Sequence, residues 1–409
     1  MRGDADLALE VVILLIFGVF ILLFGAPLPW IHTGSLPYNP DSTHGLFLVL
    51  VSLQVVTMGK TPFGDLRRSW LVVLIGIGAA VLGMSACFIP GRLAELVRVS
   101  VGIILAAGGL SLFLQLLLSD EKAKKWMRIA GILRHLTVAC GLVYLLSVVA
   151  GLITLFPGIV PDHVTAGLLV VYGISFLYLA GAIQKVYWLK PPEERKLTGC
   201  GAATGEPLQG GASRLFREAS LPLSVATIVM IAVLLTLLGS VLIPVNLGLI
   251  PFSPDGLQGL LLVLFAVQMM ALGETPIGHF KRSWPMIAIG IAFVAAGAFA
   301  CIAPGILTGM LRAFLGLLNI LAGTTFFARR LIQKIRDRRV PPAGPAPPVV
   351  RKLQATLTAL NVVVIAFGIT MFLPSMVPGL ANAAIIIANG ALLLVLAALL
   401  WKIDEDACR

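Results

Sequence analysis

Apolar residues form long runs along this chain, and shorter polar segments separate the runs. Each run holds roughly 17–25 residues, which is enough for one helix to cross about 30 Å of hydrocarbon. The alternating segments of about ten residues that mark membrane β-strands are absent from the sequence. The pattern predicts an all-α, polytopic membrane protein of about twelve transmembrane helices, near residues 10–27, 45–59, 71–89, 94–118, 132–156, 164–186, 221–243, 257–273, 285–303, 306–328, 353–373 and 379–401.

The sequence also repeats itself at a shift of 214 residues, which places Gln54 on Gln268 and Cys87 on Cys301. The shift becomes 217 further on, where Pro157 falls on Pro374. Such a run of identities predicts two six-helix repeats, at residues 1–190 and 221–403, with a cytoplasmic linker at 191–220 and a cytoplasmic tail at 404–409. Because six is an even number, we expect both repeats to enter the membrane in the same orientation, around a pseudo-twofold axis along the membrane normal.

Composition and charge agree with this class. The chain is 58% apolar and 12% charged, whereas about 25% of residues are charged in a soluble domain. A net charge of +11 would suggest a nucleic-acid partner if it were considered alone. However, all the Lys and Arg residues except Arg92, Arg98 and Arg312 fall on one predicted side. This asymmetry predicts cytoplasmic termini and contact with anionic lipid headgroups of the bilayer, and no nucleic acid.

Tryptophan residues show the same asymmetry. Aromatic rings of this kind prefer the membrane–water interface. Five of the six Trp fall at the predicted cytoplasmic interface, and Trp30 falls at the outer one; the five are Trp70, Trp126, Trp188, Trp284 and Trp401.

Spans 2 and 8, at 45–59 and 257–273, are short, reaching roughly 22–26 Å at 1.5 Å per residue. Each follows a P-x-x-P-D segment, in which we expect Asp41 and Asp255 to be helix N-caps, and each precedes G-x-T-P-x-G. Short, Gly/Pro-interrupted segments at matching places in two halves point to a transport site.

The substrate path predicted from this pattern lies between the two repeats. Gln54 and Gln268 would face it at mid-span, next to Thr61, Pro62, Thr275 and Pro276. A basic cytoplasmic mouth of Arg67, Arg68, Lys281 and Arg282 would attract anions. The alternative is that both Gln side chains only bond between helices and that the basic residues only keep the loops inside.

Two charge differences between the repeats suggest a gate. Lys60 stands where the second repeat has Glu274, and Asp65 stands where it has His279. If the two loops face each other, Lys60–Glu274 and Asp65–His279 pairs would close the cytoplasmic side, although exposed pairs contribute only about 0–1 kcal/mol. The alternative is drift between duplicated copies.

Other chemistry has no support in the sequence. It contains no catalytic motif and no metal-ligand spacing, so we expect no enzymatic activity, no catalytic or metal site and no cofactor. No Asp, Glu or His lies at mid-span, which argues against proton relays. Glu95 and Arg98 have the spacing of a pair on a helix surface. Cys87 and Cys301 are interpreted as small packing residues, or as a bridge if the repeats meet there.

A recurring rhythm runs from Trp70 through Gly76, Pro90 and Gly102 to Gly109, and it returns in the second repeat. It resembles the hairpin repeat of HdeD, an acid-resistance membrane protein, and its six-span bacterial relatives. The resemblance implies two fused units, a bacterial cytoplasmic (inner) membrane and a stress-related role, and it brings no site residues.

These observations leave several functions open. The first is a channel or facilitative transporter for a small solute, with anions as the first candidates. The second is a non-transporting, stress-protective or scaffold subunit, whose partners would be its own copies or proteins of a membrane complex. A third, lipid handling, rests only on the basic mouth.

Overall fold

The computed structural model describes residues 7, 9–57, 70–89, 91, 93–118, 131–189, 223–271, 284–337, 348–373 and 377–407. Helices are the only regular secondary structure in these residues, so the all-α prediction is confirmed. The helices are α1 (Leu9–Gly25), α2 (Leu28–His32), α3 (Pro40–Thr57), α4 (Trp70–Phe88), α5 (Ala94–Leu118), α7 (Ile132–Leu155), α8 (Asp162–Leu189), α10 (Leu223–Asn246), α11 (Pro254–Ala271), α12 (Trp284–Ile302), α13 (Thr308–Asp337), α14 (Pro348–Phe372) and α15 (Gly379–Ala407).

Ten spans among the described residues are long and apolar enough to cross a membrane. This is the composition of a multi-pass membrane protein. Neither α3 nor α11 is among the ten, and these two helices correspond to the predicted short spans 2 and 8.

The chain divides into two compact units by contact. Unit 1 holds residues 1–220 and 253–306, and unit 2 holds residues 221–252 and 307–409. Helices α11 and α12 therefore pack with helices of the first predicted repeat rather than with the rest of the second. The predicted repeats are a feature of the sequence, and the compact units do not follow their boundaries.

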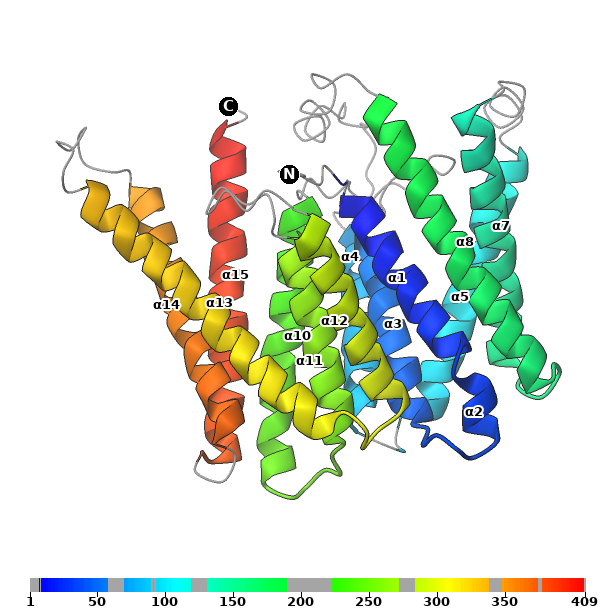
Figure 1. Ribbon diagram of the computed structural model, residues 1–409. Coiled ribbons are helices and arrows are strands. Elements are labelled where there is room, and N and C mark those ends of the chain that lie inside the picture. Colours follow the sequence, from blue (N-terminus) through cyan, green and yellow to red (C-terminus); the bar gives the residue numbers. More distant parts are fainter. Residues whose placement is uncertain are drawn as a thin grey trace. The chain divides into compact units, whose positions relative to one another are not determined.

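Helices of unit 1 pair most closely as α3 with α4, α5 with α7, and α1 with α8 (Figure 1). Glycine allows the close approach in each pair. A Cβ atom on Gly83 of α4 would lie 2.5 Å from the carbonyl oxygen of Gly45 on α3. Between α8 and α1, a Cβ atom on Gly173 would lie 2.9 Å from the Gly18 carbonyl oxygen. Both distances are too short for a side chain, so small residues define these contacts.

Unit 2, taken by itself, uses the same pairing. Helix α10 packs along α15, and α13 packs along α14. A Cβ atom on Gly368 of α14 would lie 2.7 Å from the carbonyl oxygen of Gly316 on α13. These two glycines correspond in the repeat to Gly151 and Gly102, which mark the contact between α7 and α5 in unit 1.

Two reciprocal hydrogen bonds join the short helices of unit 1 to the opposite repeat. The Asn39 amide donates to the Ile302 carbonyl oxygen at 3.1 Å, and the Ser253 amide donates to the Phe88 carbonyl oxygen at 2.9 Å. Both donors and both acceptors are 214 residues apart in sequence. Contacts that exchange partners in this way are typical of an isologous interface. They also place the starts of α3 and α11 at the same end of unit 1.

The two short helices begin earlier than expected, at Pro40 and Pro254, and each has 18 residues, or about 27 Å. Asn39 accepts the Ser42 amide at 3.1 Å and is therefore the N-cap of α3. Ser253 accepts the Gly256 amide at 3.5 Å at the start of α11. The prediction that Asp41 and Asp255 are N-caps is therefore wrong, because both lie inside the first helical turn.

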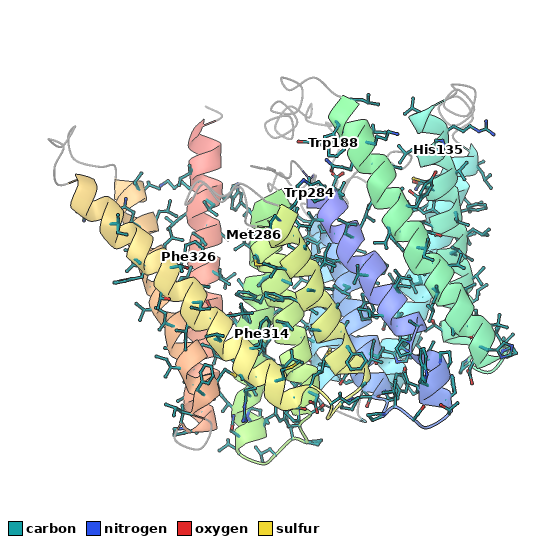
Figure 2. All side chains as sticks on the ribbon, viewed as in Figure 1. His135, Trp188, Trp284, Met286, Phe314 and Phe326 are labelled. Atoms are coloured by element: carbon teal, nitrogen blue, oxygen red, sulfur yellow. The ribbon has the colours of Figure 1, made fainter. Side chains whose placement is uncertain are left out.

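Aromatic side chains mark the two ends of unit 1. Trp188 at the end of α8, Trp284 at the start of α12 and His135 at the start of α7 lie at the same end (Figure 2). Trp30 lies on α2, which precedes the start of α3 at the other end, and its side chain is 58% exposed. The two ends agree with the two interfaces that the distribution of Trp predicts.

Candidate functional site

The residues predicted to form the substrate path lie mostly outside the described part of the chain. Gln54 lies on α3 and Gln268 on α11, but their side chains are not among those described. The remaining residues of the predicted path, mouth and gate are outside the described residues; they are Lys60, Thr61, Pro62, Asp65, Arg67, Arg68, Glu274, Thr275, Pro276, His279, Lys281 and Arg282. Their predicted roles stay predictions.

The described neighbours of the two Gln residues are apolar and mostly buried. Leu53 and Val56 near Gln54, and Val267 and Met270 near Gln268, are buried, whereas Val55 and Met269, which directly follow the two Gln residues, are half-buried. The Ser52 hydroxyl donates to the Leu48 carbonyl oxygen of its own helix at 2.6 Å. An amide at either Gln position therefore lies on a helix whose middle is packed into unit 1, where a polar group needs a hydrogen-bond partner.

Polar side chains gather instead at the end where α3 begins. We call this group the polar cluster; its members are Tyr38, Asp41, Thr43, His44, Glu95 and Arg98. They come from the segment before α3, from the first two turns of α3 and from the first turn of α5. The cluster lies at the start of α3, at the opposite end of this helix from Thr57.

Asp41 and Arg98 hold neighbouring elements together. The Gly91 amide, in the turn between α4 and α5, donates to Asp41 Oδ2 at 2.6 Å. Arg98 Nη2 lies 2.6 Å from Glu95 Oε2, which confirms the predicted helix-surface pair. Arg98 Nη1 donates to the Thr154 carbonyl oxygen at 2.9 Å. The guanidinium thus donates to a carbonyl oxygen in the last turn of α7 that has no partner within the helix. A cation at this position is also stabilised by the negative end of the helix dipole.

His44 lies in the second turn of α3, among these charges. Its Nδ1 lies 2.7 Å from the Pro40 carbonyl oxygen, which requires a proton on Nδ1 for a hydrogen bond. Its ring stands edge-on to Phe24 of α1, with centroids 6.4 Å apart. Arg98, Asp41 and Glu95 all act on it electrostatically. The cluster thus places one titratable imidazole between two carboxylates and a guanidinium.

Tyr38 is the member of the cluster that lies in the loop before α3. Burial raises the pKa of its hydroxyl to about 12, the Asp41 carboxylate adds to that rise, and a hydrogen bond with Thr43 opposes it. The phenol is therefore neutral at physiological pH, and it contributes to the cluster by hydrogen bonding rather than by charge.

The repeat separates the framework of the cluster from the residues added to it. Asp41, Gly91 and Arg98 have counterparts of the same type in Asp255, Gly305 and Arg312. Four other members are replaced by less polar or smaller residues in the second repeat: Tyr38 by Phe252, Thr43 by Leu257, His44 by Gln258 and Glu95 by Gly309. The shared residues therefore shape the turn, and the four others make the first repeat chemically different.

Analysis of the sequence did not find this cluster. It placed the start of span 2 at residue 45, which left His44 outside the membrane-facing part of the chain. A search at the shift of 214 for polar residues present in one repeat only would have identified it, because Tyr38, Thr43 and Glu95 meet that criterion. Gln258, which replaces His44, is 8% exposed, and its Oε1 has no hydrogen-bond partner in the described structure.

Comparison with known proteins finds no matching family model, no matching curated protein and no matching solved structure. The function of the chain must therefore be inferred from its own residues.

Proposed function

We propose that this chain is a twelve-span membrane protein that lets a small solute, with anions as the first candidates, cross between its two repeats. The two parallel six-helix repeats would surround a pseudo-twofold axis along the membrane normal. Both termini would lie in the cytoplasm of a bacterial cell, and the protein would lie in its cytoplasmic membrane. The path would run along α3 and α11, from the polar cluster to the basic mouth.

The observation that carries this proposal is the pair of short helices. Helices α3 and α11 fall outside the ten clear spans, they start at one end of unit 1, and each contacts a helix of the opposite repeat. A helix with a polar start and a Gln in its last turn, as α3 and α11 both have, is costly in a bilayer unless protein or water surrounds it. Matching helices of this kind in both repeats favour a shared function over chance.

A second candidate function is a non-transporting scaffold or stress-protective subunit, which the resemblance to HdeD suggests. The buried apolar residues beside Gln54 and Gln268 favour it, since they are the residues of a packed interior. In that case the basic loops would bind lipid headgroups or partner proteins, or copies of the chain would assemble.

Cysteine accessibility distinguishes the two functions. Single Cys residues would replace Gln54 and Gln268 in a chain without its native Cys, and membrane-impermeant thiol reagents would be added from each side. Ile75→Cys and Ile289→Cys are matched controls, because these apolar side chains are 57% and 48% exposed and lie 214 residues apart. We expect labelling at both Gln positions and none at the controls.

Labelling at the Gln positions alone would establish a wet path and justify transport assays with small anions. The absence of labelling from either side would mean a dry interior, which contradicts transport and leaves the scaffold function.

A further inference from the structure

Cys87 and Cys301 bring the two repeats together through their side chains. Both are free thiols that are fully buried, at 0% and 1% exposure, and they lie close enough to interact with each other. Each also lies near a carbonyl oxygen at the start of the short helix of its own repeat. Cys87 Sγ lies 3.6 Å from the Ser42 oxygen, and Cys301 Sγ lies 3.7 Å from the Gly256 oxygen. The four residues form two pairs related by the shift of 214.

The backbone around the two thiols is tightly packed. The Ser42 hydroxyl donates to the Cys87 carbonyl oxygen at 2.6 Å. A Cβ atom on Gly256 would collide with that same carbonyl oxygen and lie 2.7 Å from Ser42 Oγ. Helix α11 therefore approaches α4 with no room for a side chain, and the thiols have little freedom to separate.

We propose that Cys87 and Cys301 form a disulfide that joins α4 to α12 and links the two repeats covalently. Two properties of the pair support this. The two sulfurs lie 3.6 and 3.7 Å from the carbonyl oxygens of Ser42 and Gly256 in the same tightly packed contact, so the second thiol is present at a high effective concentration wherever the first is oxidised. They also occupy equivalent positions, and residues near a twofold axis meet their own counterparts.

Burial determines which oxidant can act on the folded protein. A bulky reagent cannot reach either sulfur, whereas a small uncharged peroxide can. One thiol takes an oxygen atom from hydrogen peroxide to become a sulfenic acid, and one water is released. The second sulfur then attacks the sulfenic sulfur, the S–O bond breaks, the S–S bond forms, and the thiol proton leaves with hydroxide as a second water. Two thiols lose two electrons, and one peroxide is reduced to two waters.

A chain that carries only this pair provides the test. Ser would replace Cys140, Cys200 and Cys408, and a protease site would be placed in the 191–220 linker. The purified, reduced protein would be treated with hydrogen peroxide, quenched with catalase and denatured, and its thiols would be counted by the gel shift of a polyethylene glycol maleimide. We expect two shifts before peroxide, none after it and two again after reduction. The cut halves should stay joined on a gel without reductant and separate with it.

The matched controls are the same chain with Cys87→Ser or Cys301→Ser. A single thiol has no partner, so peroxide should carry it past the sulfenic acid to sulfinic acid, whose gel shift reductant does not restore, and the cut halves should separate without reductant. Loss of both thiols from the pair with separated halves would overturn the proposal, as would thiols of the pair that reductant does not restore. If the substitutions prevent folding, mass spectrometry of unreduced peptides from the peroxide-treated unaltered chain replaces them, and absence of a Cys87–Cys301 peptide would then overturn it. None of these outcomes depends on transport.

Discussion

Asp41 illustrates how a single side chain fixes the end of two helices. It lies in the first turn of α3, where the positive end of the helix dipole stabilises a carboxylate. It also accepts a hydrogen bond from the amide of Gly91, in the turn that follows α4. Gly91 has a φ of +82°, which favours glycine, so its amide is directed by a backbone shape that few residues adopt. A charged acceptor makes such a hydrogen bond stronger than a neutral one.

Replacing Asp41 by Asn should lower the free energy of unfolding in detergent by about 1–2 kcal/mol, because the charged acceptor of the Gly91 amide is lost. Thermal unfolding of the purified protein measures this. Asp162→Asn is the matched control, because Asp162 also lies in a first turn but pairs with exposed His32 at 3.2 Å. Both substitutions remove a carboxylate from the start of a helix and therefore lose the same stabilisation by the helix dipole. Beyond that shared loss, Asp162→Asn should lower the free energy of unfolding by less than about 0.5 kcal/mol, because its ion pair is exposed. Equal losses in both variants would show that the Gly91 contact does not matter.

Tyr38 should make stability depend on pH in the alkaline range. Its pKa is raised from 10.0 to about 12 in the folded protein, so folding favours the neutral phenol. The stabilisation is fully present below pH 10 and is lost as the pH rises through about 12. Tyr38→Phe should remove this part of the pH dependence, and ultraviolet difference absorbance should show one phenolate fewer with a pKa near 12. A wild-type titration with no such late phenolate would contradict the prediction.

At this scale the sequence predicted contacts between near neighbours and missed those between elements. The Glu95–Arg98 pair was predictable because helix geometry alone places residues three apart on one face. The link from Asp41 to Gly91, and the approach of His44 to Phe24, depend on how α3, α4, α5 and α1 pack. Local spacing contains no information about that packing.

Among the helices, glycine determines which faces meet. Runs of small residues such as Gly76-x-Gly78 and the stretch from Gly102 to Gly109 are typical of helices that pack closely. A Cβ atom on Gly76 would lie 2.5 Å from Val56 Cγ2, whereas Gly78 and Gly108 have no neighbouring atom within 4 Å. A glycine-rich run therefore identifies a contact region, but the helix rotation that decides which glycine is used comes from the partner.

Ala substitutions at Gly83 and Gly78 should have opposite effects. Gly83→Ala places a Cβ atom 2.5 Å from the Gly45 carbonyl oxygen, so α3 and α4 must separate, which should cost about 1–3 kcal/mol. Gly78→Ala meets nothing and should stabilise α4 by about 0.5–1 kcal/mol through helix propensity. Thermal unfolding in detergent measures both variants of this one helix.

The second repeat offers an independent check on the same contact. Gly297→Ala should be destabilising like Gly83→Ala, because its Cβ atom would lie 2.6 Å from the Gly259 carbonyl oxygen. A loss of stability for Gly78→Ala comparable to that for Gly83→Ala would mean that the Cβ contact across the α3–α4 interface does not explain the effect.

Helix ends were predicted well where the helix ends with its apolar run. They were predicted less well where a capped polar turn extends the helix beyond that run. The predicted span at 94–118 coincides with α5, and 71–89 differs from α4 by one residue at each end. The predicted start of span 2 is five residues late, because the first turn of α3, Pro40 to Thr43, is polar and hydropathy does not detect it. Asn39 caps that turn, and a capped polar turn extends a helix beyond its apolar run.

For the whole molecule, the number of spans decides the symmetry. Ten spans would give each repeat five, an odd number, and the two repeats would be inverted relative to each other. Twelve spans include α3 and α11, and the repeats would then be parallel. The reciprocal bonds from Asn39 to Ile302 and from Ser253 to Phe88 support the parallel arrangement, since both short helices start at one end of unit 1.

Single Cys residues at Ser35 and Leu249 test this directly in a chain without its native Cys. The two positions are 214 residues apart, both are exposed, and each follows a glycine with positive φ, Gly34 at 72° and Gly248 at 73°. With twelve spans and cytoplasmic termini, an impermeant maleimide should label both from the outside of intact cells. With ten spans, Ser35→Cys would be labelled from outside, and Leu249→Cys only after the membrane is permeabilised. Labelling on opposite sides would remove the pseudo-twofold axis along the membrane normal, and with it the central path that the two short helices are proposed to form.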